Sequence, residues 1–158
     1  MGAIGTINNL AGGVTVTIED DFSKVDKTMK MGETIKLTDE QAVHFVHDRY
    51  YVGDETNVQR MKRQEQYKEG LKKNLGEKCS EDNKYPLTIY DALGDYMVTD
   101  INSQKFSKLA LLVLKDKDAG TVSIDGTESV DDLGFVEVQP DEESLQKAIL
   151  TLFYKEYK

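Results

Sequence analysis

Cysteine, proline and tryptophan are scarce in this chain of 158 residues, which has one cysteine, two prolines and no tryptophan. A single cysteine, Cys79, excludes an internal disulfide and a metal site built from several thiolates. The two prolines and the 39% share of hydrophobic residues indicate a folded chain rather than a disordered one. The sequence therefore predicts a folded protein with a hydrophobic core, located in a reducing compartment.

Long apolar runs are also missing from the chain. The longest strongly apolar run, residues 109–114, is far shorter than a membrane-spanning helix requires. Residues 1–13 have neither the basic start nor the apolar stretch of a secretory signal. We therefore expect a cytoplasmic protein that contacts no membrane.

The common catalytic signatures are absent as well. The sequence has no GxxxxGK[ST] phosphate loop, no GxGxxG after a strand, and no HExxH, GxSxG or CxxC motif. It therefore identifies no catalytic residue and no cofactor, and we expect a protein that is not an enzyme.

The hydrophobic periodicity predicts an α+β fold, mostly helical, in a single domain that spans residues 1–158. Residues 1–13 are rich in glycine and asparagine, which predicts a flexible arm or one that orders on a partner. Alternating residues predict short strands at 14–18, 33–37, 121–124 and 135–138. Helical spacing predicts helices at 22–29, 38–53, 54–75, 88–98 and 141–157. We expect one small antiparallel sheet of about four strands beside these helices.

Two local signals sharpen this prediction, and one segment stays ambiguous. Thr38 and Gln41 are spaced as a capping box, which marks the start of a helix. Ser103 could cap another helix, but residues 109–114 fit a buried strand equally well. The last helix has apolar residues over most of its circumference, so it is either central to the core or docked against a partner.

The chain's two histidines lie close together in the predicted helix 38–53. At helical spacing, His44, His47 and Asp48 fall on one side of it, opposite the apolar residues Ala42 and Val46. Two imidazoles and a carboxylate could hold a divalent metal or transfer a proton. A solvated helix face would carry the same residues, and no further ligand can be named, so we predict no metal site.

Charge is distributed very unevenly along the sequence. Residues 116–143 contain ten acidic residues and one lysine, which accounts for the whole net charge of −9. Such a segment steers association with a basic surface and opposes nucleic-acid binding. The acidic residues predicted to contact a partner are Asp125, Glu128, Asp131 and Asp132.

These observations lead to a functional hypothesis with two alternatives. The hypothesis is a non-enzymatic regulator or inhibitor that docks on a protein partner with a basic surface, such as a bacteriophage or mobile-element inhibitor of a nucleic-acid enzyme. One alternative is a structural subunit of a larger assembly such as a virion. The other is a metal-assisted enzyme that uses His44 and His47.

Overall fold

The computed structural model describes residues 2–116 and 120–154. The chain divides into two compact units, Met1–Asp116 and Lys117–Lys158. Each unit combines α-helices with one two-stranded antiparallel sheet, so the predicted α+β class is confirmed. The strands form two separate sheets rather than one sheet of four.

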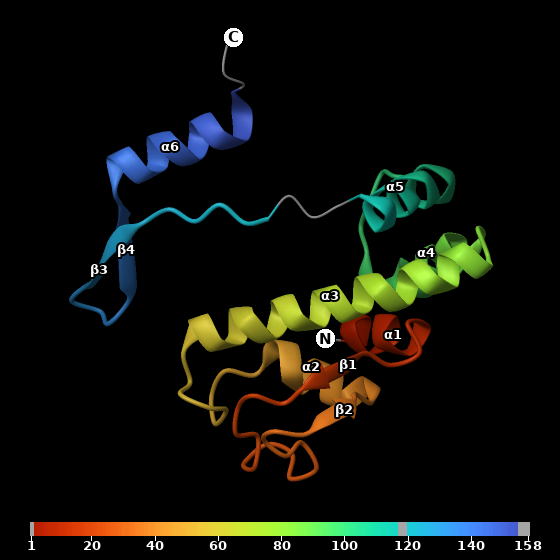
Figure 1. Ribbon diagram of the computed structural model, residues 1–158, viewed down its shortest axis with the longest axis horizontal. Coiled ribbons are helices and arrows are strands. Elements are labelled where there is room, and N and C mark those ends of the chain that lie inside the picture. The colour runs from red at the N-terminus through yellow and green to blue at the C-terminus, as the bar shows by residue number, and fades with distance from the viewer. Residues whose placement is uncertain (1, 117–119, 155–158) are drawn as a thin grey trace. The chain divides into compact units, whose positions relative to one another are not determined.

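The first unit contains a small sheet and five α-helices among its described residues. Its elements are α1 (Gly2–Leu10), β1 (Thr15–Thr17), β2 (Thr34–Lys36), α2 (Asp39–His47), α3 (Asn57–Glu81), α4 (Tyr85–Leu93), the 3-10 turn η1 (Gly94–Tyr96) and α5 (Ser103–Lys115). Strand β1 pairs with β2, with Val16 opposite Ile35. The long helix α3 contacts α2, β1, α4 and α5 (Figure 1).

The core of this unit brings together side chains from α1, β1, α2, α3 and α4 and from the loops between them. The rings of Phe22 and Phe45 stack with centroids 6.0 Å apart. Ile18 and Met29 are also fully buried, and Val52 reaches the same core from the segment between α2 and α3. Burial of large apolar side chains supplies the main stabilisation of the unit.

Residues 2–10 form helix α1 and not the irregular arm that their composition predicts. Ile4, Ile7 and Leu10 recur at helical spacing and pack against the core. Asn8 is buried, and its amide nitrogen donates to the carbonyl oxygen of Leu37 at 3.1 Å. These tertiary contacts outweigh the low helix propensity of glycine and asparagine.

Asn8 joins α1 to three other parts of the chain, at Val14, at residues 37–39 and at Tyr67. Its Nδ2 also donates to a carboxylate oxygen of Asp39 at 3.0 Å. Its Oδ1 accepts the backbone N–H of Val14 at 3.1 Å and faces the Tyr67 hydroxyl at 3.4 Å. The buried amide is therefore satisfied on both its donor and its acceptor side.

Helix α2 begins as predicted and ends earlier. The Gln41 backbone N–H donates to the Thr38 hydroxyl at 3.2 Å, and the Gln41 side chain accepts the Thr38 backbone N–H at 3.0 Å. The helix stops at His47, six residues before Gly53. The predicted helix at 22–29 does not form, since those residues make a series of turns that Phe22 and Met29 anchor in the core.

The second unit consists of β3 (Gly126–Val130), β4 (Val136–Pro140) and α6 (Glu142–Phe153). The two strands pair in antiparallel register, with Glu128 opposite Val138. Residues 121–124, predicted as a strand, lie before β3 and have no regular structure. Asp141 caps α6 by accepting the Ser144 backbone N–H at 2.8 Å.

The apolar residues of α6 are largely exposed. Ala148 is the buried hydrophobic residue of the described part of the second unit, whereas Leu152 and Phe153 are exposed. The helix is therefore not central to a core within its own unit. Residues 109–114, whose structure the sequence leaves open, belong to helix α5.

Candidate anion-binding site

The segment between α2 and α3, residues 48–56, is short and tightly held. Val52 points inward and is 1% exposed. The Gly53 backbone N–H donates to the carbonyl oxygen of Asp21 at 3.1 Å. A side chain at Gly53 would collide with the Gln59 amide and lie 3.2 Å from the Asp20 carboxylate. The absence of a side chain at Gly53 thus permits the close packing of this loop.

Two residues of the same loop, Tyr51 and Glu55, adopt left-handed backbone conformations. Their φ angles are 64° and 61°. Each such residue stores roughly 1–3 kcal/mol, and strain of this kind is concentrated at functional sites. The Tyr51 backbone N–H donates to the Glu55 carboxylate at 3.1 Å, which fixes the turn. The anchored Val52 and Gly53 therefore hold Tyr51 in an unfavourable backbone conformation.

This loop forms one wall of a pocket of about 500 Å³, which we call the loop pocket. Its lining residues are Val25, His47, Asp48, Arg49, Tyr50, Tyr51 and Arg60. The lining contains two guanidinium groups and one carboxylate. Before any histidine is protonated, the pocket therefore carries a net positive charge.

Tyr50 orients Arg49 in the loop pocket. The Arg49 guanidinium lies over the Tyr50 ring, 4.5 Å from its centroid. Its Nη2 also donates to the Tyr50 hydroxyl. Among the described residues, Tyr50 is the hydrogen-bond partner of this guanidinium, so its remaining N–H groups stay available to a ligand.

Arg60 comes from the first turn of α3 and has an unsatisfied donor. Its Nη2 donates to the Asn57 side chain at 2.7 Å. Its Nε is the one buried side-chain nitrogen or oxygen that finds no hydrogen-bond partner within residues 2–116 and 120–154. A buried donor without a partner is unfavourable by about 1–3 kcal/mol. An anion in the loop pocket could supply the missing acceptor.

Two residues of the predicted histidine cluster, His47 and Asp48, line this pocket. Nδ1 of His44 is 2.7 Å from one oxygen of Asp48, and Nδ1 of His47 is 3.2 Å from the other. The carboxylate is therefore shared by the two imidazoles. Over the described part of the chain, no group of three or more histidine, cysteine or acidic residues is arranged to hold a metal ion.

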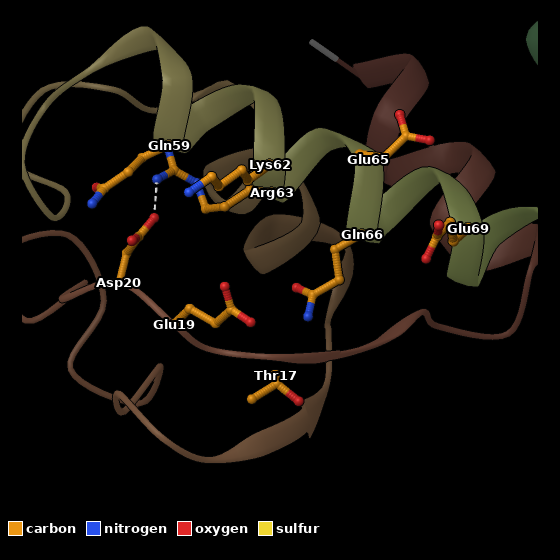
Figure 2. Close-up of a pocket in the computed structure, with 9 residues that line it drawn as sticks. All are labelled: Thr17, Glu19, Asp20, Gln59, Lys62, Arg63, Glu65, Gln66 and Glu69. Atoms are coloured by element: carbon orange, nitrogen blue, oxygen red, sulfur yellow. Dashed lines mark hydrogen bonds and ion pairs between the residues drawn. The ribbon is translucent and has the colours of Figure 1, made fainter. Parts of the chain in front are cut away.

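A second pocket of about 510 Å³, which we call the helix pocket, lies between α3 and the segment that follows β1 (Figure 2). Figure 2 shows Thr17, Glu19 and Asp20 on one side, with the remaining lining residues on α3. The lining contains four carboxylates and two cations; it consists of Thr17, Glu19, Asp20, Gln59, Lys62, Arg63, Glu65, Gln66 and Glu69. An anion would meet a net negative charge here.

Arg63, one of the helix pocket's two cations, is occupied by structural contacts. The side chains of Arg63 and Asp20 form an ion pair and are 5% and 9% exposed. Nε of Arg63 donates to the Phe45 carbonyl oxygen at 2.9 Å, and its Nη2 donates to the Asp48 carbonyl oxygen. Arg63 thus ties α3 to α2 and to the loop after β1, and the loop pocket remains the better anion site.

The acidic residues predicted to contact a partner all belong to the second unit. Asp125 precedes β3, Glu128 lies in it, and Asp131 and Asp132 lie in the turn after it. The Asp131 carboxylate accepts the backbone N–H groups of Leu133 and Phe135 and so stabilises this turn. The role of these residues in binding stays a prediction.

Comparison with known proteins places the chain in a family. The model of the LytR_cpsA_psr family matches residues 2–152. The chain belongs to this family. No curated protein matches it.

Solved structures share the fold. TagV from B. subtilis is 19% identical with a TM-score of 0.68, and the match covers 98% of this chain and 62% of TagV. A transcriptional regulator from Enterococcus faecalis is 20% identical with a TM-score of 0.68, covering 98% of this chain and 57% of the regulator. A protein from Streptococcus agalactiae is 20% identical with a TM-score of 0.69, covering 99% and 56%. The chain therefore spans less than two thirds of the length of these structures.

Family membership corrects the functional hypothesis drawn from the sequence. The LytR_cpsA_psr family is associated with cell-wall assembly, so the hypothesis of a phage or mobile-element inhibitor is wrong. The alternatives of a virion subunit and of a metal-assisted enzyme built on His44 and His47 are replaced as well. No helix in the described residues is both long and apolar enough to cross a membrane.

Proposed function

We propose that the chain binds a phosphate group of a substrate used in cell-wall polymer transfer, and that Arg49 and Arg60 hold this group in the loop pocket. The chain belongs to a family that resembles cell-wall polymer transferases, which supports a substrate of cell-wall polymer transfer. The main support for this location is the buried Nε of Arg60, which lacks a hydrogen-bond acceptor among the described residues. The proposal concerns binding and assigns no catalytic residue.

The chemistry of the pocket fits an anionic group such as a phosphate better than a neutral sugar. Guanidinium groups offer several N–H donors in one plane and bind phosphate oxygens in pairs. Arg49 and Arg60 are both partly buried, so their attraction to an anion is less screened than at an open surface. The contact with Tyr50 holds Arg49 in place before the ligand arrives, which reduces the entropy lost on binding.

Binding of inorganic pyrophosphate to the purified chain tests the proposal. Isothermal titration calorimetry should give a dissociation constant that rises in Arg60→Gln and in Arg49→Gln. Each loss removes a charge-assisted hydrogen bond, so we expect a change of roughly 10- to 100-fold. The matched control is Lys62→Gln, which removes one positive charge from an exposed residue of the same helix in the other pocket. This control should change the dissociation constant less than about threefold.

Two results would contradict the proposal. One is the absence of pyrophosphate binding by a chain that is folded by circular dichroism. The other is equal loss of binding in Lys62→Gln and Arg60→Gln, which would show that only the overall charge of α3 matters.

A further inference from the structure

Tyr51 is an exposed aromatic side chain on a strained backbone. It is 65% exposed, although its neighbour Val52 is fully buried. Tyr51 lines the loop pocket, and its ring stacks on no other ring or cation of the described residues. A glycine would adopt the same φ of 64° without strain, so the tyrosine at this position is not explained by the turn itself.

The neighbouring tyrosine differs from Tyr51 in this respect. The ring and hydroxyl of Tyr50 are both engaged with Arg49. Tyr50 therefore positions the cation, whereas the Tyr51 ring remains uncovered beside it. The pocket thus combines two guanidinium groups with an unoccupied aromatic surface.

We propose that the ring of Tyr51 is a platform for the sugar of a glycosyl phosphate whose phosphate is held by Arg49 and Arg60. This inference rests on the proposed function and extends it from the phosphate to the group attached to it. One face of a pyranose ring carries C–H groups with partial positive charge, and the face of an aromatic ring is negative. A pocket of about 500 Å³ has room for a monosaccharide phosphate. Tyr51 is accordingly a specificity-determining residue for the sugar.

Two ligands of equal charge distinguish the contribution of the sugar to binding from that of the phosphate. The ¹⁵N-labelled chain is titrated with N-acetylglucosamine 1-phosphate and with glycerol 1-phosphate, and dissociation constants are taken from amide shifts of residues 48–60. We expect the sugar phosphate to bind roughly 2- to 10-fold more tightly, as an aromatic contact of this kind provides. In Tyr51→Gly this ratio should fall to about one, because the ring that contacts the sugar is lost while both guanidinium groups remain. Tyr51→Phe should keep the ratio.

The thermal midpoint of Tyr51→Gly completes the test. The glycine should leave the midpoint unchanged or raise it, because the backbone strain is removed and little buried surface is lost. A clear fall in the midpoint would assign Tyr51 a structural role and overturn the inference. Equal affinity of the wild-type chain for the two phosphates, or a ratio that persists in Tyr51→Gly, would overturn it too. Each of these results leaves phosphate binding by Arg49 and Arg60 intact, whereas failure of both ligands to bind would refute the proposed function.

Discussion

Replacing Arg63 by methionine should destabilise the first unit strongly. Methionine keeps much of the side-chain volume and removes the guanidinium that contacts the Asp20 carboxylate and the carbonyl oxygens of Phe45 and Asp48. The guanidinium also lies 5.4 Å from the centroid of the Phe22 ring. The substitution therefore leaves a buried carboxylate without its counter-charge and two carbonyl oxygens without their donor.

The magnitude follows from burial. The Asp20 side chain is 9% exposed, so it cannot regain full hydration when its partner is lost. Breaking a buried ion pair on one side typically lowers the free energy of unfolding by about 3–5 kcal/mol. The two carbonyl oxygens add to this loss to the extent that water cannot reach them. We expect a decrease at the upper end of this range.

Urea unfolding followed by far-UV circular dichroism measures the effect. Lys62→Met is the matched control, since it makes the same replacement at the exposed preceding residue and should change stability by less than about 0.5 kcal/mol. In the double variant Asp20→Asn, Arg63→Met, no unpaired charge remains buried. It should therefore be more stable than the sum of the single changes predicts, by about 0.5–3 kcal/mol. A loss below about 1 kcal/mol in Arg63→Met, or strict additivity in the double variant, would refute this reasoning.

Two further predictions concern α2 and Tyr67. Thr38→Ala removes the hydroxyl that accepts the Gln41 backbone N–H, so it should lower the free energy of unfolding by about 1 kcal/mol, whereas Thr38→Ser should be nearly neutral. Burial raises the pKa of Tyr67 from 10.0 to about 12, because the phenolate loses hydration and also faces Asp39. The folded state holds this proton more tightly, so the contribution of Tyr67 to stability is complete below pH 10 and is lost as the pH rises towards 12. Tyr67→Phe should flatten the dependence of unfolding on pH in this range, and an equally steep loss in the variant would contradict the assignment.

Local signals in the sequence predicted parts of the fold well. The capping box at Thr38 and Gln41 is a contact between near neighbours, and it forms as predicted. The α+β class follows from alternating and helical periods that survive in the folded chain. Helix α1 has a helical period in Ile4, Ile7 and Leu10, but its glycine and asparagine content favoured an irregular segment, and Asn8 finds its partners 6 to 59 residues away.

The sequence pattern predicted only part of the structure around the loop pocket. The pattern predicted a helix that continues to Gly53. In the structure α2 ends at His47 and Tyr50 is 62% exposed. Arg60 lies within the predicted helix 54–75, where no feature of the sequence singles it out. Nothing in its spacing reveals an unpaired Nε, which depends on how α3 packs in three dimensions. The prediction that the chain is not an enzyme stays a prediction.

The connections of Asn8 have a consequence for the order of folding. The loops that they close span 29, 31, 6 and 59 residues, so most of these hydrogen bonds require distant parts of the chain to meet first. Closing such loops reduces chain entropy before any bond is gained. Helix α1 is too short to persist alone in water, and its amphipathic face finds the core only once α2 and α4 are in place. We therefore expect the N-terminal helix to dock late in folding, and the buried amide to couple α1 to the segment before β1, to α2 and to α3.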